Sequence, residues 1–208
     1  MALTKTTEND KIEVVNRWNI QVRTATVIKE DGKELNRSFH RKVLVPGQLN
    51  ASDNLAATIT PQHVLLNRSD FFDVSFQPHN YCLPVLKEEH DRLAVLGAAT
   101  SGNCKFFLGT DSAPHPRSKK ESGCGCAGIF SAYNALGIYA EIFDEQNKLD
   151  KLEAFASFFG ADFYGLERND EKITLIKNKT KIPEMVAFDN DKLVPLRAGE
   201  NCAWQVKY

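Results

Sequence analysis

An acidic and a basic side chain stand four residues apart in the loop at residues 109–128, GTDSAPHPRSKKESGCGCAG. They are the carboxylate of Asp111 and the imidazole of His115, and a proline lies on each side of the histidine. The loop follows the apolar run Lys105–Leu108, which predicts a buried strand. Residues at the carboxyl ends of strands face the active site in β/α architectures. This pattern therefore indicates part of a catalytic site.

The same two residues also have purely structural interpretations. A carboxylate that follows a strand is commonly a turn or helix-capping residue. A histidine between two prolines can be an ordinary loop residue. Asp111 and His115 alone do not separate these alternatives, so the elements that position them must be considered.

Other residues near this loop could bind a metal ion or an anion. Cys124 and Cys126 form a Cys-x-Cys pair without a second Cys or His pair nearby, so we interpret them as loop thiols. His63 and His79 could be replacement metal ligands, although hydrogen bonding within a loop is the commoner role. The basic run at 117–120 could contact phosphate, but a solvated loop explains it equally well and no aromatic stacking pattern accompanies it.

Two short apolar runs with a helix between them predict the frame that carries these residues. Leu55–Thr60 and Lys105–Leu108 are typical of buried strands in a parallel sheet. Pro84–Ala99 has apolar and charged faces at helical spacing, with Pro84 in the first turn. A right-handed crossover makes the two strands parallel. The sequence thus predicts an α/β fold.

The rest of the chain predicts two further helices and several short strands. Ala127–Glu145 is expected to be a helix buried on more than one side, and Leu149–Phe159 a second helix closed by Gly160. The tail up to Trp204 alternates short β-like runs, at 173–176, 185–188 and 193–196. We interpret the phenylalanines of these elements as packing residues: Phe106, Phe107, Phe130, Phe143, Phe155, Phe158 and Phe159.

Residues 18–45 predict a β-hairpin with its turn at Asp31-Gly32. The polar segment Gln48–Asn54 that follows suits a boundary between two domains. We therefore expect an N-terminal hairpin module of unknown role at residues 1–53 and a second domain at residues 54–208.

The bulk composition excludes some classes of protein. The 208 residues include 26 basic and 27 acidic side chains, so no global field attracts nucleic acid or an anionic membrane. No apolar run is long enough to span a bilayer, and the first residues lack the apolar core of a secretory signal. Five scattered cysteines fit reduced thiols. We expect a cytoplasmic protein.

Six motifs follow one another in the second domain. They are LAATITPQH (55–63), PHNYCLPVLK (78–87), FLGTDSAPH (107–115), KESGCGCAG (120–128), FYGL (163–166) and LVPLRAGE (193–200). In these motifs the chain resembles the C-terminal part of the bacterial single-function (class II) dihydroorotases of the amidohydrolase superfamily. The resemblance covers residues 55–208 and leaves residues 1–53 unassigned.

The resemblance implies part of a (β/α)8 barrel, about its last two strands and C-terminal helices. It implies two zinc ions and the interconversion of N-carbamoyl-L-aspartate and L-dihydroorotate in pyrimidine synthesis. Asp111 matches the metal-binding carboxylate that shuttles the catalytic proton. His115 matches the histidine that binds the substrate carboxylate, while Leu83 and Ala127 match positions that contact the substrate ring through backbone groups.

The other metal ligands of the family have no counterpart in this chain. The family uses a His-x-His pair on the first barrel strand, a carboxylated lysine on the fourth strand and single histidines on the fifth and sixth. This chain contains no His-x-His. One aspartate cannot assemble a two-zinc site. We therefore expect a truncated dihydroorotase-like protein that is inactive alone. The alternative is a non-catalytic binding or regulatory protein built on a barrel remnant.

Two parallel strands alone would leave an unpaired sheet edge and exposed apolar surface. We expect the N-terminal hairpin to pair with these strands, or the chain to form a homo-oligomer or bind a complementing subunit. The expected ligand is a small molecule, the dihydroorotate or carbamoyl aspartate that the resemblance implies.

Overall fold

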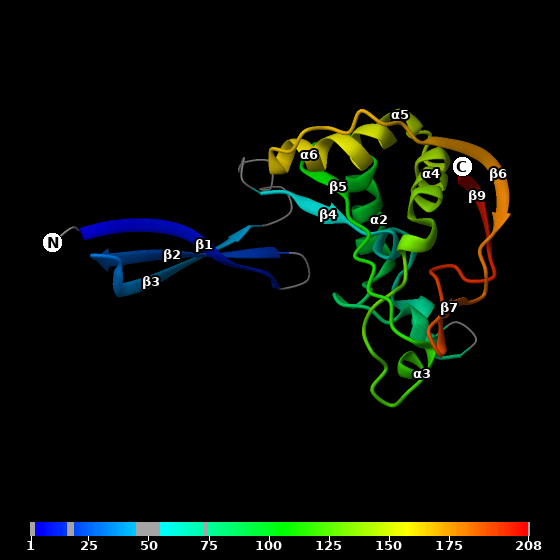
Figure 1. The fold of residues 1–208 in the computed structure, drawn as a ribbon, viewed down its shortest axis with the longest axis horizontal. Coiled ribbons are helices and arrows are strands. Elements are labelled where there is room, and N and C mark those ends of the chain that lie inside the picture. Colours follow the sequence, from blue (N-terminus) through cyan, green and yellow to red (C-terminus); the bar gives the residue numbers. More distant parts are fainter. Residues whose placement is uncertain (1–2, 16–18, 45–54, 73–74, 208) are drawn as a thin grey trace. The chain divides into compact units, whose positions relative to one another are not determined.

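Residues 3–15, 19–44, 55–72 and 75–207 are described by the computed structural model shown in Figure 1. The chain divides into two compact units, Met1–Leu55 and Ala56–Tyr208, here called the N-terminal unit and the C-terminal unit. The predicted junction at Gln48–Asn54 lies outside the described residues.

The N-terminal unit is an antiparallel sheet in the order β1-β2-β3. Its strands are β1 (Leu3–Val15), β2 (Asn19–Glu30) and β3 (Lys33–Leu44) (Figure 1). Asp31 and Gly32 form the turn between β2 and β3 with φ of 48° and 85°, because a two-residue hairpin turn requires left-handed backbone. The predicted hairpin is confirmed, although its ends at Trp18 and Val45 lie outside the described residues. The mostly polar sequence of β1 gave no strand signal.

The C-terminal unit combines short helices with sheets of two strands each (Figure 1). Its strands are β4 (Ala57–Ile59), β5 (Phe106–Leu108), β6 (Thr174–Lys181), β7 (Val186–Phe188), β8 (Asp191–Leu193) and β9 (Asn201–Lys207). Its α-helices are α1 (Pro61–Leu65), α2 (Glu89–Ala99), α3 (Arg117–Lys120), α4 (Ala135–Glu145), α5 (Leu149–Glu153) and α6 (Phe159–Tyr164). Shorter turns are η2 (Arg68–Phe71), η3 (Pro78–Asn80) and η4 (Ala132–Asn134), and η5 (Ala154–Phe158) is π-helical.

β4 and β5 form the parallel pair that the sequence predicts, with Ile59 beside Leu108. Parallel strands end at the same edge, so the segments that begin at Thr60 and Gly109 start next to each other. The amide of Gly109 donates to the carbonyl of Ile59 at 2.9 Å, which continues the pairing beyond β5. The candidate functional residues His63 and Asp111 follow the two strands at this edge.

Tyr139 of α4 fastens the carboxyl ends of the two strands. Its side chain is fully buried, and its hydroxyl donates to the carbonyl of Ile59 at 2.6 Å, with the carbonyl of Gly109 at 3.3 Å. The ring packs edge-on against Phe155, with 5.3 Å between centroids. Burial raises the pKa of the hydroxyl, so it stays a donor. α4 therefore holds the strand ends in place.

The helix predicted at Pro84–Ala99 begins later, at Glu89. The carbonyl of Lys87 accepts a hydrogen bond from the amide of Arg68 at 2.6 Å, so this backbone pairs with a neighbouring segment instead of starting a helix. The prediction that Pro84 occupies the first turn is wrong for this reason.

The helix predicted at Ala127–Glu145 begins at Ala135. The backbone before it is extended, because Ile129 forms a parallel β-bridge with Ser112. The prediction of burial on more than one side is confirmed for α4, whose buried residues are Ala135, Gly137, Ile138, Tyr139, Ala140, Ile142 and Phe143.

The helix predicted at Leu149–Phe159 continues to Tyr164 and does not end at Gly160. A β-carbon on Gly160 would lie 3.2 Å from the ring of Phe107, so this glycine allows close packing on β5. The helix ends at Gly165, whose φ of 65° is the left-handed conformation typical of a helix terminus. The predicted end at Gly160 is wrong, because the sequence alone does not distinguish a glycine that allows close packing, Gly160, from one that ends a helix, Gly165.

The β-like runs predicted at 173–176 and 185–188 are confirmed in outline, whereas the run predicted at 193–196 is a strand only at Leu193, where β8 ends. β6 pairs with β9 and β7 pairs with β8, both antiparallel. β6 and β9 extend further than the sequence suggested, to Lys181 and Lys207. Phe107, Phe143 and Phe155 are buried, whereas the other phenylalanines predicted to pack are partly buried.

The strand pairs of the described residues do not close a barrel. β4 pairs with β5, and β2 and β3 belong to the sheet with β1. The expected pairing of the hairpin with β4 or β5 is not among these strand pairs.

Replacing Tyr139 with Phe removes only the hydroxyl that binds the strand ends. We expect the free energy of unfolding to fall by about 1–2 kcal/mol, because a buried carbonyl loses a donor. Urea unfolding of the variant and the wild type measures the difference. Tyr133→Phe is the control, since the Tyr133 side chain is 49% exposed. Equal losses in both variants would contradict the role given to Tyr139.

Candidate functional site

Asp111 lies just beyond β5 in a loop whose backbone is held on both sides. The Ser131 hydroxyl donates to the carbonyl of Thr110 at 2.7 Å, and the amide of Ala132 donates to the Ser112 hydroxyl at 3.1 Å. Asp111 has a φ of 41°, a left-handed conformation that aspartate adopts more readily than most residues. Its side chain is exposed. The segment leading into α4 therefore presents the carboxylate at the strand edge.

His63, in helix α1 just after β4, uses both of its ring nitrogens inside the chain. Nε2 donates to the carbonyl of Pro84 at 2.8 Å. Because a neutral imidazole has one donor and one acceptor, Nδ1 accepts from the Thr60 hydroxyl at 2.6 Å. Burial lowers the pKa of His63, against the opposing charge of Asp111. These contacts favour the hydrogen-bonding interpretation of His63 over the ligand interpretation.

Cys82 lies close to His63, with 3.9 Å between Sγ and Nε2, a pairing that could activate a thiol. The thiol does not fit that role. Burial raises the pKa of Cys82 to about 11, so it stays protonated at neutral pH. Sγ donates to the same Pro84 carbonyl, at 3.6 Å, that His63 binds. Cys82 is therefore a structural thiol.

His115 and Ala127, two of the predicted substrate-binding residues, are in direct contact. Nε2 of His115 donates to the carbonyl of Ala127 at 3.0 Å. Gly128 permits this approach, because a β-carbon there would lie 2.9 Å from Cδ2 of His115 and 2.4 Å from the carbonyl oxygen of Ala113. The imidazole thus fixes the backbone at Ala127.

Leu83, the remaining predicted substrate-binding residue, is 59% exposed and follows the buried Cys82. Its segment is joined to that of Ala127, because the amide of Gly128 donates to the carbonyl of Tyr81 at 2.9 Å. The charge of Asp111 adds to the effect of burial in raising the pKa of Cys82. The structure thus brings the predicted substrate-binding residues into one connected backbone region near Asp111.

A buried lysine strengthens this connection, and sequence analysis missed it. Lys120 is 3% exposed, and its Nζ donates to the carbonyls of Tyr81, Cys126 and Gly128 at 2.8, 2.9 and 2.7 Å. Burial lowers the pKa of Lys120 to about 8. The solvated-loop interpretation of the basic run is wrong for this residue. A run of like charges does not reveal which side chain the loop folds over.

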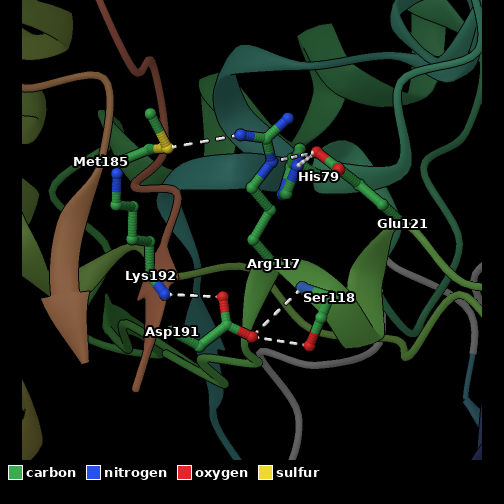
Figure 2. A network of polar contacts seen from close by, with 7 residues as sticks. All are labelled: His79, Arg117, Ser118, Glu121, Met185, Asp191 and Lys192. Carbon is green, nitrogen blue, oxygen red and sulfur yellow. Dashed lines mark hydrogen bonds and ion pairs between the residues drawn. The ribbon is translucent and has the colours of Figure 1, made fainter. Parts of the chain in front are cut away.

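Exposed polar contacts fasten the rest of α3, as Figure 2 shows. Arg117 donates to Glu121 at 2.7 Å, and Nε2 of His79 lies 3.1 Å from the same carboxylate oxygen. Arg117 is the main cause that lowers the pKa of Glu121. The Ser118 hydroxyl donates to Asp191 of β8 at 2.6 Å (Figure 2). These contacts favour the loop interpretations of His79 and Arg117.

The metal-binding potential of this region is limited. Among the residues that the structure describes, no three His, Cys, Asp or Glu side chains form a group that could hold a metal ion. Cys124 and Cys126 are free thiols, and the carbonyl of Cys126 accepts a hydrogen bond from Lys120. The described residues near Asp111 therefore do not fit a two-zinc site by themselves.

Solved structures identify the class of protein that shares this fold. The dihydroorotase of Saccharomyces cerevisiae in complex with 5-fluoroorotic acid matches with a TM-score of 0.69 and 35% identity, over 75% of this chain and 44% of that chain. The dihydroorotase of Campylobacter jejuni matches with a TM-score of 0.69 and 33% identity, over 78% of this chain and 47% of that chain. Most of the chain thus has the fold of part of a dihydroorotase.

Curated relatives are more similar in sequence. Dihydroorotases from Nitrosomonas eutropha and Synechocystis sp. are 59% and 60% identical over 155 and 156 residues, which is 74% and 75% of this chain. The mitochondrial dihydroorotase of Arabidopsis thaliana is 60% identical over 152 residues. The matches cover 45%, 46% and 40% of these relatives, so the chain spans less than half their length. No family model matches the chain. The predicted resemblance to dihydroorotases is confirmed.

Replacing Gly128 with Ala should displace the His115–Ala127 contact. The glycine has a φ of 148° and no space for a β-carbon, so we expect a loss of about 1–3 kcal/mol in the free energy of unfolding. Thermal unfolding measures it. Gly123→Ala is the matched control, because nothing lies within 4 Å of its added β-carbon. An unchanged stability of Gly128→Ala would contradict the close approach of His115 and Ala113 to Gly128.

The lowered pKa of Lys120 predicts a pH dependence of stability. Between about pH 8 and the ordinary lysine pKa of 10.5, the unfolded chain keeps a proton that the folded chain has released. Over this window the stability of the wild type should therefore rise relative to Lys120→Met, by at most about 1.4 kcal/mol per pH unit. Urea unfolding at several pH values measures it. A flat difference between the wild type and Lys120→Met over this window would refute the lowered pKa.

Proposed function

We propose that the chain supplies the last two strands of a dihydroorotase barrel together with part of its substrate site. In this proposal it interconverts N-carbamoyl-L-aspartate and L-dihydroorotate only with a polypeptide that carries the remaining strands. The supporting observation is the similarity of about 60% over 75% of the chain, with Asp111 exposed at the carboxyl edge of the parallel pair. β4 and β5 are then strands of a partial (β/α)8 barrel.

The proposed roles of the residues follow from their contacts. Asp111 would bind metal and move a proton, since its carboxylate is exposed at the edge. His115 would bind the substrate carboxylate. Its Nε2 is already a donor to Ala127, so only the doubly protonated imidazole could also donate through Nδ1. The backbone groups of Leu83 and Ala127 would contact the ring.

Zinc would serve this reaction by acidifying water and polarising the amide carbonyl. Asp111 could provide one ligand, but His63 and His79 are engaged in hydrogen bonds within the chain. The remaining ligands must therefore come from the partner polypeptide, which is why the proposal requires it.

A non-catalytic binding protein is the second candidate. The contacts of His63 favour it, because this histidine, which lies within reach of the charge of Asp111, uses both ring nitrogens within the chain. The two candidates differ in whether a polypeptide with the missing strands restores turnover.

No helix in the described residues is both long enough and apolar enough to cross a membrane. A cytoplasmic location is proposed with the enzymatic function, although the Arabidopsis relative is named mitochondrial. The proposed partner is a complementing subunit, which would cover the open edges of β4 and β5.

The test mixes this chain and zinc with the part of Nitrosomonas eutropha dihydroorotase that the chain does not match. We expect dihydroorotate turnover by the mixture and none by either polypeptide alone. Asp111→Asn in the mixture should lower kcat by about 100-fold or more, since it removes the proton-transferring group. Spectrophotometric assay of dihydroorotate hydrolysis measures these rates.

Asp189→Asn is the matched control for this experiment. Asp189 is also exposed and also has left-handed backbone, with a φ of 50° against 41° for Asp111, so both substitutions impose the same backbone demand. An inactive mixture that nevertheless forms a complex would favour the non-catalytic candidate. Turnover by the chain alone, abolished by Asp111→Asn, would contradict the need for a partner.

A further inference from the structure

We propose that Lys120 is a positioning residue for substrate binding. Its ammonium group orients the backbone amide of Ala127 and connects it to the segment Tyr81–Leu83. The inference rests on the proposed function and deepens it. Nothing in the sequence pattern assigned a role to this lysine, which belongs to a run of basic residues.

The ammonium group uses all of its donors on the backbone. Its three N–H groups match the three carbonyls of Tyr81, Cys126 and Gly128, at 2.8, 2.9 and 2.7 Å. Two of these residues flank Ala127 on either side, and the third lies two positions before Leu83. One side chain thus connects both segments.

The geometry of the peptide bond transmits this contact to Ala127. In a planar trans peptide the carbonyl and the N–H point in opposite directions. The Cys126 carbonyl points to Nζ of Lys120, so the amide N–H of Ala127 must point away from the lysine. The next peptide is fixed as well, because His115 binds the Ala127 carbonyl and the Gly128 amide binds Tyr81. Both peptide planes around Ala127 are therefore set.

The cost of burying this group indicates that its polar contacts matter. A buried ammonium without hydrogen-bond partners is strongly unfavourable. Lys120 is 3% exposed, and its Nζ contacts three neutral carbonyls and the face of the Tyr81 ring, 5.8 Å from the ring centroid. Packing alone could be supplied by an apolar side chain of similar length. The choice of lysine points to control of the carbonyls.

Lys120→Met in the full chain tests whether the lysine holds the two segments. We expect amide hydrogen exchange at Gly128 to accelerate by about tenfold, and the amide resonances of Leu83 and Ala127 to shift, because the shared anchor is lost. Exchange in α4 should be unchanged. Lys119→Met, which removes an exposed charge next in sequence, should change neither. Unchanged exchange at Gly128, or equal acceleration in α4, would overturn the proposal.

Kinetics in the mixture with the complementing polypeptide test the link to substrate. Lys120→Met should raise KM for dihydroorotate by about tenfold with a smaller change in kcat, whereas a purely structural role would lower the amount of active complex and leave KM unchanged. An unchanged KM would overturn the substrate role. If the wild-type mixture is inactive, the proposed function fails, and the substrate role of Lys120 falls with it; the exchange result then still decides separately whether the lysine holds the backbone.

Discussion

The parallel pairing of β4 with β5 is the constraint on which the rest of the site depends. Because the two strands run in the same direction, the chain leaves both of them at one edge. The segment with His63 starts from one strand, and the segment with Asp111 starts from the other. Tyr139 keeps the two strand ends together from α4. The pairing therefore places the start of the Asp111 segment beside the start of the His63 segment.

A second layer of backbone contacts organises what the strand ends present. The carbonyl of Tyr81 accepts from both Lys120 and Gly128, and the carbonyl of Ala127 accepts from His115. These groups are held by side chains and glycine geometry, not by a sheet. The region around Leu83, His115 and Ala127, which we propose to bind substrate, is thus preorganised by hydrogen bonds within the chain.

The sequence predicted what depends on local pattern. Apolar runs marked β4 and β5, and Asp31-Gly32 marked the hairpin turn, because each signal is contained in a few neighbouring residues. The errors involve contacts distant in sequence. Ile129 bridges to Ser112, which delays the start of α4, and Gly160 packs on Phe107 without ending a helix. The burial of Lys120 depends on how its loop closes over Tyr81, which no short pattern encodes.

In the proposed function, the chain provides a preorganised substrate region and one metal ligand, Asp111, and another polypeptide provides the remaining ligands. Zinc content of the purified chain, measured by atomic emission after gel filtration, tests this most directly. The account predicts no tightly bound zinc in the chain alone and zinc retained by the complex with the complementing polypeptide, lost again with Asp111→Asn. Two zinc ions retained by the chain alone would contradict it.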